Sequence, residues 1–307
     1  MPDRAPTAPL LAALAVVLTW GLNFPLSKAL FNQVGAAGFL GLRYLLMPLC
    51  AVALLCWRFG RRWPRLDRAE IGPLVRLTLV GQGLHLLLSA YGMQGSTAFS
   101  ASVLLACGPV FTLLILRLSG LERLSRSQVT GVAAAATGAL LFTADKLLAA
   151  DWQASLGDLT LLVAAALFSY YTVAAKPLIQ HHGGVTVLAY GSLVCTLPML
   201  LWCAPALRAL DWAAQPAWLW SGLLWQVISC GFLGWLAWGW AVERRGVART
   251  APLIYLMPLI AGITAWAVGS EPFSAHKLLG AAVILTGVAL AQFSPSMPRE
   301  LKARPDA

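Results

Sequence analysis

Charged side chains are scarce in this sequence: 11% of its 307 residues are Asp, Glu, Lys or Arg, whereas 59% are apolar. Ordinary soluble domains carry roughly 25% charged and roughly 45–50% apolar residues. A water-soluble fold of this length could not hide so many apolar side chains and still cover its surface with polar groups. The shortage of charge therefore excludes a soluble globular protein and indicates a chain whose surface lies in lipid.

Sequence signals for metal sites, disulfides and cleavage are also missing. The six cysteines never form the Cys-x-x-Cys spacing of a zinc or redox site, and all fall within or at the edge of apolar runs. Cysteine here is expected to act as a small hydrophobe, so we predict no disulfide framework, no metal site and no cofactor. No clean small-x-small cleavage site follows the first apolar run, which we interpret as a membrane helix and not as a removable signal peptide.

Ten apolar runs are long enough to cross a membrane, because a spanning helix needs about 20 mostly apolar residues. The connections between them are short, so consecutive helices must be antiparallel neighbours. The sequence thus predicts an all-α, polytopic membrane protein. The ten spans, numbered in chain order, are expected at Leu10–Phe31, Gly35–Trp57, Ile71–Met93, Thr97–Leu118, Ser125–Thr143, Leu156–Leu178, Val185–Leu207, Ala217–Trp240, Val247–Val268 and Ser274–Phe293.

The distribution of Lys and Arg orients this bundle. With the N-terminus inside, 17 of the 22 basic residues lie on the cytoplasmic side and four on the opposite side, while Arg43 falls within a span. Under the positive-inside rule this split places both termini in the cytoplasm. The basic residues form no patch with aromatic residues, so we expect a lipid bilayer as partner and no nucleic acid. The expected location is a bacterial inner membrane.

The two halves of the chain repeat each other, which divides it into residues 1–149 and 150–307. A shift of 149 residues gives nine identities in 35 ungapped positions. Each half holds five spans, an odd number, so the halves must be inverted in the membrane, an architecture that recurs in transporters. The matched residues are Leu104, Pro109, Gly120, Glu122, Ser125, Gly131, Ala133, Thr137 and Gly138 in one half, and Leu253, Pro258, Gly269, Glu271, Ser274, Gly280, Ala282, Thr286 and Gly287 in the other.

Short motifs accompany this repeat, namely Trp20-Gly21-Leu22-Asn23-Phe24 in span 1, Leu42-Arg43-Tyr44 in span 2 and Leu121-Glu122-Arg123-Leu124-Ser125 before span 5. In their order and spacing the chain resembles the drug/metabolite transporter superfamily, of the EamA type with two five-helix repeats. The resemblance covers nearly the whole chain, but the second repeat lacks the arginine found at position 123. It implies export of amino acids or related small molecules through a central cavity lined by spans 1, 3, 4, 6, 8 and 9. We expect a monomer or homodimer.

Candidate substrate-binding residues are the polar and aromatic groups on those spans. Polar side chains inside lipid are costly and usually face the bundle interior or a wet cavity. Asn23 and Gln82 are either substrate ligands or hydrogen-bonding groups between helices, and His85 is a cavity ligand, a proton carrier or a packed core histidine. The predicted set is Trp20, Asn23, Phe24, Gln82, His85, Ser89, Ser100, Tyr170, Tyr171, Gln226, Trp235, Trp238 and Tyr255.

Other residues are assigned hinge or structural roles. Pro109 and Pro258 are expected to break spans 4 and 9 symmetrically and to act as hinges. Arg43 either snorkels outward, bonds the carbonyls of a kinked neighbour or binds a substrate carboxylate, and we favour the structural role. Glu122 and Glu271 fall in loops and are expected to be structural, with Glu122 near the positive end of the following helix.

Two local patterns support this structural reading. Ser125 and Gln128 have the capping-box spacing that marks the start of span 5. Paired glycines in spans 5 and 10 predict close contact between those helices; they are Gly131, Gly138, Gly280 and Gly287.

The prediction is a transporter and not an enzyme. An intramembrane hydrolase would depend on Ser89 with His85, and this pair has no third orienting group. A carrier of sugar phosphates or nucleotides would need several basic residues in the cavity, where Arg43 stands alone. A lipid flippase is the remaining alternative.

Energy coupling is constrained by the acidic residues. All 12, including Asp158, fall in loops, tails or helix ends of the expected spans. Many proton- and sodium-driven carriers use a carboxylate inside the membrane. We therefore favour movement down the substrate's own gradient. The alternative is proton exchange through His85, because the unperturbed pKa of histidine is about 6.5.

Overall fold

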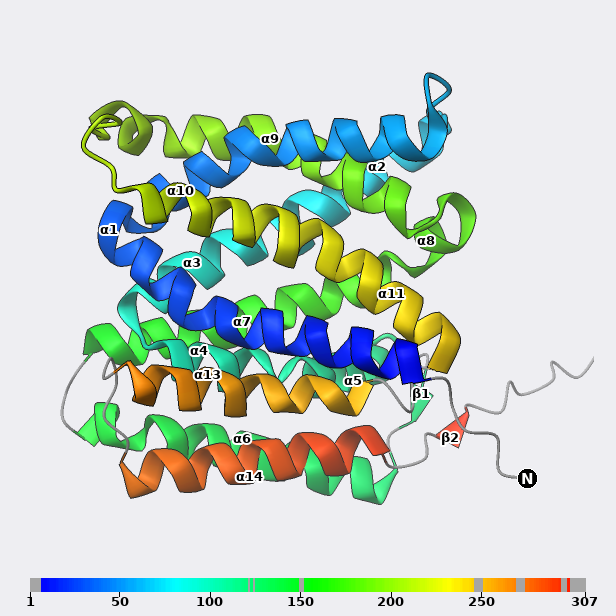
Figure 1. The fold of residues 1–307 in the computed structure, drawn as a ribbon. Coiled ribbons are helices and arrows are strands. Elements are labelled where there is room, and N and C mark those ends of the chain that lie inside the picture. The colour runs from blue at the N-terminus through cyan, green and yellow to red at the C-terminus, as the bar shows by residue number, and fades with distance from the viewer. Residues whose placement is uncertain are drawn as a thin grey trace, which may run out of the picture.

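The computed structural model describes residues 7–120, 122–123, 125–148, 152–245, 251–268, 274–293 and 297–298. These residues are mainly helical, and β1 (Glu122–Arg123) and β2 (Met297–Pro298) form a short antiparallel strand pair. The helices run side by side as one bundle, with α9 at one edge and α6 and α14 at the other (Figure 1). The predicted all-α membrane protein of ten helices is confirmed.

The first two spans are two helical segments that share the label α1 (Thr7–Phe59) and are separated by a sharp turn at Gly35, whose backbone is not helical. Gly35 has φ +70°, a left-handed conformation that residues with a Cβ disfavour. The sequence predicts a span boundary at this residue, and the structure turns there within a single residue. Gly183, with φ +81°, has the same function between α8 (Lys176–His182) and α9 (Gly184–Ala209).

Spans 3 and 8 each contain a π-helix in the middle. A π-helix loosens the backbone ladder and often marks a functional site. Since spans 3 and 8 occupy equivalent places in the two halves, the paired π-helices are a further sign of the internal repeat. Span 3 consists of α2 (Arg68–Thr78), η1 (Leu79–Leu84) and α3 (His85–Gly95), and span 8 of α10 (Ala217–Leu224), η2 (Trp225–Leu233) and α11 (Gly234–Arg245).

Spans 4 and 9 are broken near their prolines, as predicted. Pro109 lies in the first turn of α5 (Gly108–Leu118), just after α4 (Ala98–Leu105) ends. Pro258 lies in the first turn of α13 (Leu256–Ala267), after the 3₁₀-helix η3 (Ala251–Tyr255). Proline fits the first turn of a helix because its missing N–H would have no intrahelical partner there.

The paired glycines bring α6 (Arg126–Leu148) and α14 (Ala275–Phe293) into direct backbone contact. A Cβ added at Gly131 would lie 2.5 Å from the backbone nitrogen of Ala291, and one at Gly280 would lie 2.5 Å from that of Phe142. Real Cβ atoms do not approach other atoms so closely, so the two helices pack this tightly only because glycine is present. The predicted close contact between spans 5 and 10 is confirmed.

The capping box at the start of α6 is also confirmed. The backbone N–H of Gln128 donates to Ser125 Oγ over 3.2 Å, and the Ser125 N–H donates to Gln128 Oε1 over 2.8 Å. Glu122, assigned a structural role, belongs to strand β1. Glu271 lies outside the described residues.

Candidate functional site

Five aromatic side chains from three helices form a continuous row, called here the aromatic chain. Phe168 and Tyr171 of α7 (Trp152–Ala174) stack with ring centroids 6.4 Å apart. Phe168 also contacts Trp235 of α11 at 6.1 Å, and Trp235 contacts Trp20 of α1 at 5.7 Å. Trp20 contacts Trp238 at 5.6 Å. All of these rings except Phe168 are predicted substrate-binding residues, and the structure brings them together from both halves of the chain.

His85, the first residue of α3, lies beside this aromatic chain. Its ring centroid is 5.1 Å from that of Phe168. Its Nδ1 lies 2.8 Å from the backbone oxygen of Ala164. A carbonyl oxygen can only accept, so Nδ1 carries the hydrogen, and in the neutral ring Nε2 is left as an acceptor. His85 can therefore offer a lone pair, or accept a proton, next to the aromatic rings.

The π-helix η2 is held by side chains of α1. The Trp20 indole N–H donates to the backbone oxygen of Cys230 over 3.0 Å, and the Cys230 thiol donates to Asn23 Oδ1 over 3.4 Å. A Cβ on Gly234 would lie 2.7 Å from Trp20 Nε1, so the missing side chain there makes room for the indole. Asn23 and Trp20 thus contact the irregular backbone of span 8.

Arg43 of α1 is half-buried inside the bundle and lies against the same π-helix. Its Nε donates to Met47 Sδ over 3.4 Å, and a Cβ on Gly231 would lie 3.9 Å from its Nη2. Among the described residues Arg43 takes part in no ion pair, so its charge is held in the bundle without a carboxylate partner.

Two predicted glutamines join helices to one another. Gln226 is 2% exposed and its Nε2 donates to Ser27 Oγ over 2.6 Å, which connects η2 to α1. Gln82 in η1 makes a long 3.5 Å contact from Nε2 to Ser192 Oγ of α9, and its buried Oε1 has no hydrogen-bond partner within the described part of the chain. Gln226 therefore fits the interhelical role, whereas Gln82 retains a free acceptor.

Four predicted residues lie elsewhere. Phe24 belongs to the main hydrophobic core, and Tyr255 packs against that core at the end of η3. Ser100 donates its backbone N–H to Thr97 Oγ1 over 3.1 Å and so takes part in capping α4. Ser89 Oγ is buried and has no hydrogen-bond partner among the residues that the structure describes, so a Ser89–His85 pair does not form.

One prediction about acidic residues is wrong. Asp158 is fully buried within α7 and accepts a hydrogen bond from Ser96 Oγ. Nearby, Lys28 Nζ donates to the backbone oxygens of Met93, Gln94 and Ser96 over 3.0, 2.8 and 2.6 Å, where a helix C-terminus attracts positive charge. The sequence places Asp158 at a helix end because its apolar run starts at Leu156, whereas α7 begins at Trp152.

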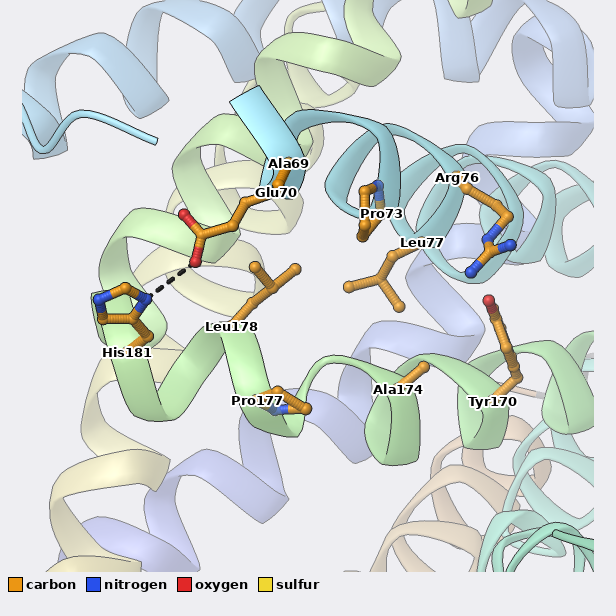
Figure 2. A pocket seen from close by; sticks show the side chains of 10 residues that line it. All are labelled: Ala69, Glu70, Pro73, Arg76, Leu77, Tyr170, Ala174, Pro177, Leu178 and His181. Carbon is orange, nitrogen blue, oxygen red and sulfur yellow. Dashed lines mark hydrogen bonds and ion pairs between the residues drawn. The ribbon is translucent and has the colours of Figure 1, made fainter. Parts of the chain in front are cut away.

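A pocket of about 350 Å³ opens between α2, α7 and α8. Figure 2 shows Glu70 and His181 at one end of it, and Arg76 and Tyr170 at the other. Tyr170 is a predicted substrate-binding residue, and the next residue in the chain, Tyr171, is the first ring of the aromatic chain. Tyr170 and Tyr171 both pack against the apolar cluster that contains the pocket residues Leu77 and Leu178, so the pocket adjoins the aromatic chain at α7.

Comparisons with known proteins agree with this arrangement. The model of the EamA-like transporter family matches residues 7–144 and again residues 155–293. A probable terminal-alkyne amino-acid exporter of Streptantibioticus cattleyicolor is 29% identical over 283 residues, which is 91% of each chain. A probable amino-acid metabolite efflux pump of Salmonella typhimurium is 27% identical over 291 residues, covering 90% of this chain and 92% of its own. One solved crystal structure has a TM-score of 0.59 at 16% identity, covers 93% of this chain and 97% of its own, and shows the same fold.

Proposed function

The chain belongs to the EamA-like transporter family, and from this premise we propose that it exports amino acids or closely related metabolites across a bacterial inner membrane. The names of the two bacterial relatives support the substrate class. The distribution of basic residues supports an orientation with both termini in the cytoplasm. In this proposal the two halves give access alternately to a site between them.

The observation that carries the proposal is Arg43 beside the aromatic chain. The Arg43 guanidinium lies against Gly231. The preceding residue is Cys230, whose backbone oxygen accepts the hydrogen bond from the Trp20 indole. A guanidinium without a carboxylate partner suits the carboxylate of an amino acid, because such pairs make strong charge-assisted hydrogen bonds. The indole faces of Trp20, Trp235 and Trp238 suit the ammonium group through cation–π attraction.

The pocket at α2, α7 and α8 supplies an entrance in this proposal. The positive-inside orientation puts the start of α2 on the cytoplasmic side. Arg76 and Glu70 give the pocket opposite charges at its two ends, which suits a zwitterion. From Tyr170 a substrate would pass to Tyr171 and Phe168 and then reach the rings of span 8 and span 1.

Movement down the substrate's own gradient remains the proposed mode of coupling. His85 is one candidate for proton coupling, and the buried Asp158 is a second that the sequence does not reveal. Asp158 accepts from Ser96 in the present structure, so its carboxylate is engaged between α7 and the end of span 3. A structural role of this kind agrees with gradient-driven transport.

The proposal is tested by metabolite profiling of cells that lack or overexpress the gene. We expect one or a few amino acids or related compounds to accumulate inside the deletion cells and outside the overexpressing cells. Overexpression of the Arg43→Gln variant, with membrane abundance checked, serves as the control and should leave the medium unchanged. Unaltered amino-acid pools in both strains, with a change in phosphorylated sugars or lipids instead, would contradict the proposal.

A further inference from the structure

Three metal-ligating side chains meet where α2 begins and α8 ends. His181 Nδ1 lies 2.8 Å from Glu70 Oε1, and His182 Nε2 lies 2.8 Å from Glu70 Oε2. Each residue offers one ligand atom, a ring nitrogen of either histidine or a carboxylate oxygen of Glu70, and these three atoms lie within 4.8 Å of one another. The Glu70 and His181 side chains point toward each other at one end of the pocket (Figure 2). The transport proposal uses Glu70 only for its charge at the end of the pocket, and it uses neither histidine.

The backbone holds these three residues in place. Glu70 lies in the first turn of α2, where its Oε2 also accepts the backbone N–H of Asp67 over 3.1 Å as part of a capping box. His181 and His182 occupy the last turn of α8, with ring centroids 4.2 Å apart, and Gly183 ends the helix immediately after them. The Asp67 bond orients the carboxylate, as outer-shell hydrogen bonds do in metal sites.

Two imidazoles and one carboxylate form a donor set that binds zinc with a fourth position open. Ligands about 2.0–2.1 Å from one ion stand roughly 3.3–3.5 Å apart. The present contacts of 2.8 Å would therefore have to widen by less than about 1 Å, which side-chain rotation can supply. His181 is 64% exposed and gives an ion access from solvent, whereas His182 is 9% exposed. We propose that Glu70, His181 and His182 bind one divalent transition-metal ion of the Zn²⁺ type, with water as the fourth ligand.

An ion at this position would tie two walls of the pocket together. Glu70 comes from the first half of the chain and the two histidines from the second, and the pocket lies between the helices that carry them. Occupancy would thus fix the distance between α2 and α8. This consequence for the pocket rests on the proposed transport function, but the binding of the ion does not.

The test is Zn²⁺ binding to the full-length protein purified in detergent, measured by competition with a chromophoric chelator. The exposed thiol of Cys56 is removed first by Cys56→Ser, because it is a competing zinc ligand. We expect one saturable equivalent of Zn²⁺. Loss of an outer-shell partner alone weakens metal sites by about 10–100-fold, so Glu70→Gln and His182→Gln should each weaken binding by at least about tenfold. His276→Gln, at an exposed histidine of α14, should leave the affinity unchanged.

X-ray absorption of the zinc-loaded protein provides the second readout. We expect nitrogen and oxygen ligands at about 2.0–2.1 Å and no sulfur. The inference is overturned if the Cys56→Ser protein binds no saturable equivalent, since this measurement requires no cluster variant to fold. It is equally overturned if Glu70→Gln and His182→Gln proteins bind Zn²⁺ with the affinity of their parent, because the ion then lies elsewhere. Either result would leave the proposed transport function standing, because that proposal does not require a bound ion.

Discussion

The indole N–H of Trp20 donates to the backbone oxygen of Cys230 over 3.0 Å, although the two residues are 210 positions apart. Cys230 lies in the π-helix η2, where the backbone ladder is irregular. One side chain of the first span therefore binds the backbone inside the irregular part of span 8. In the same place Arg43 lies against Gly231, so the charge and the aromatic chain meet at the π-helix.

The Trp20→Phe variant removes this hydrogen bond and keeps an aromatic ring. A net hydrogen bond contributes about 0.5–1.5 kcal/mol, so stability should fall only slightly, whereas transport should fall because η2 and the aromatic chain lose their alignment. Export in cells and membrane abundance are measured together. Trp57→Phe, at a side chain 75% exposed, is the matched control and should change neither. If the Trp20→Phe variant exports as well as the wild type, the hydrogen bond from Trp20 to Cys230 is not needed for transport.

The contact between α6 and α14 gives a prediction about stability. Gly280→Ala places a methyl group 2.5 Å from the Phe142 backbone nitrogen, and overpacking of this kind costs about 1–3 kcal/mol. The melting temperature of the purified protein should therefore drop. Gly72→Ala in α2 is the control, since its new methyl group meets nothing within 4 Å. Equal melting temperatures for the two variants would show that the backbones of α6 and α14 are not in direct contact.

Topology supplies a third prediction. Reporter fusions at Ala149 and Ala307 should lie on opposite sides of the membrane, because five spans separate these positions. The fusion at Ala307 should report the cytoplasm, following the distribution of basic residues. Fusions that report the same side would contradict the two inverted five-helix repeats.

Much of this fold follows from the sequence because its signals are local. Apolar runs locate the ten spans, Gly35 marks the turn between the first two, and Ser125 with Gln128 marks the start of α6. The pairing of α6 with α14 follows from the repeated glycines, since only small residues allow helices to approach so closely.

The parts that sequence reasoning missed depend on residues far apart in the chain. Asp158 meets Ser96 across 62 positions, and Glu70 meets His181 across 111. No spacing within one helix predicts such pairs. The two π-helices also escape prediction, because their sequences are apolar and continue the runs around them. Ser100 lies in the first turn of α4, where Thr97 Oγ1 accepts its backbone N–H, and its assignment to the substrate site stays a prediction.

Coupling is tested in proteoliposomes with an imposed pH gradient. The gradient-driven proposal predicts that the exported compound equilibrates and does not accumulate uphill, in the wild type and in the Asp158→Asn variant alike. Uphill accumulation that His85→Ala abolishes would instead assign coupling to His85. Uphill accumulation lost only in Asp158→Asn would assign it to the buried carboxylate.

Counterflow in proteoliposomes, with the metabolite identified by profiling, tests the central claim most directly. The account predicts saturable exchange of an amino acid or related compound by the wild type and by Arg58→Gln, whose exposed guanidinium stacks on Phe59 at the end of α1. It predicts that Arg43→Gln loses most of this exchange at equal protein content, because the substrate carboxylate loses its charged partner. Full exchange by Arg43→Gln, or exchange by the wild type no faster than in protein-free liposomes, would contradict it.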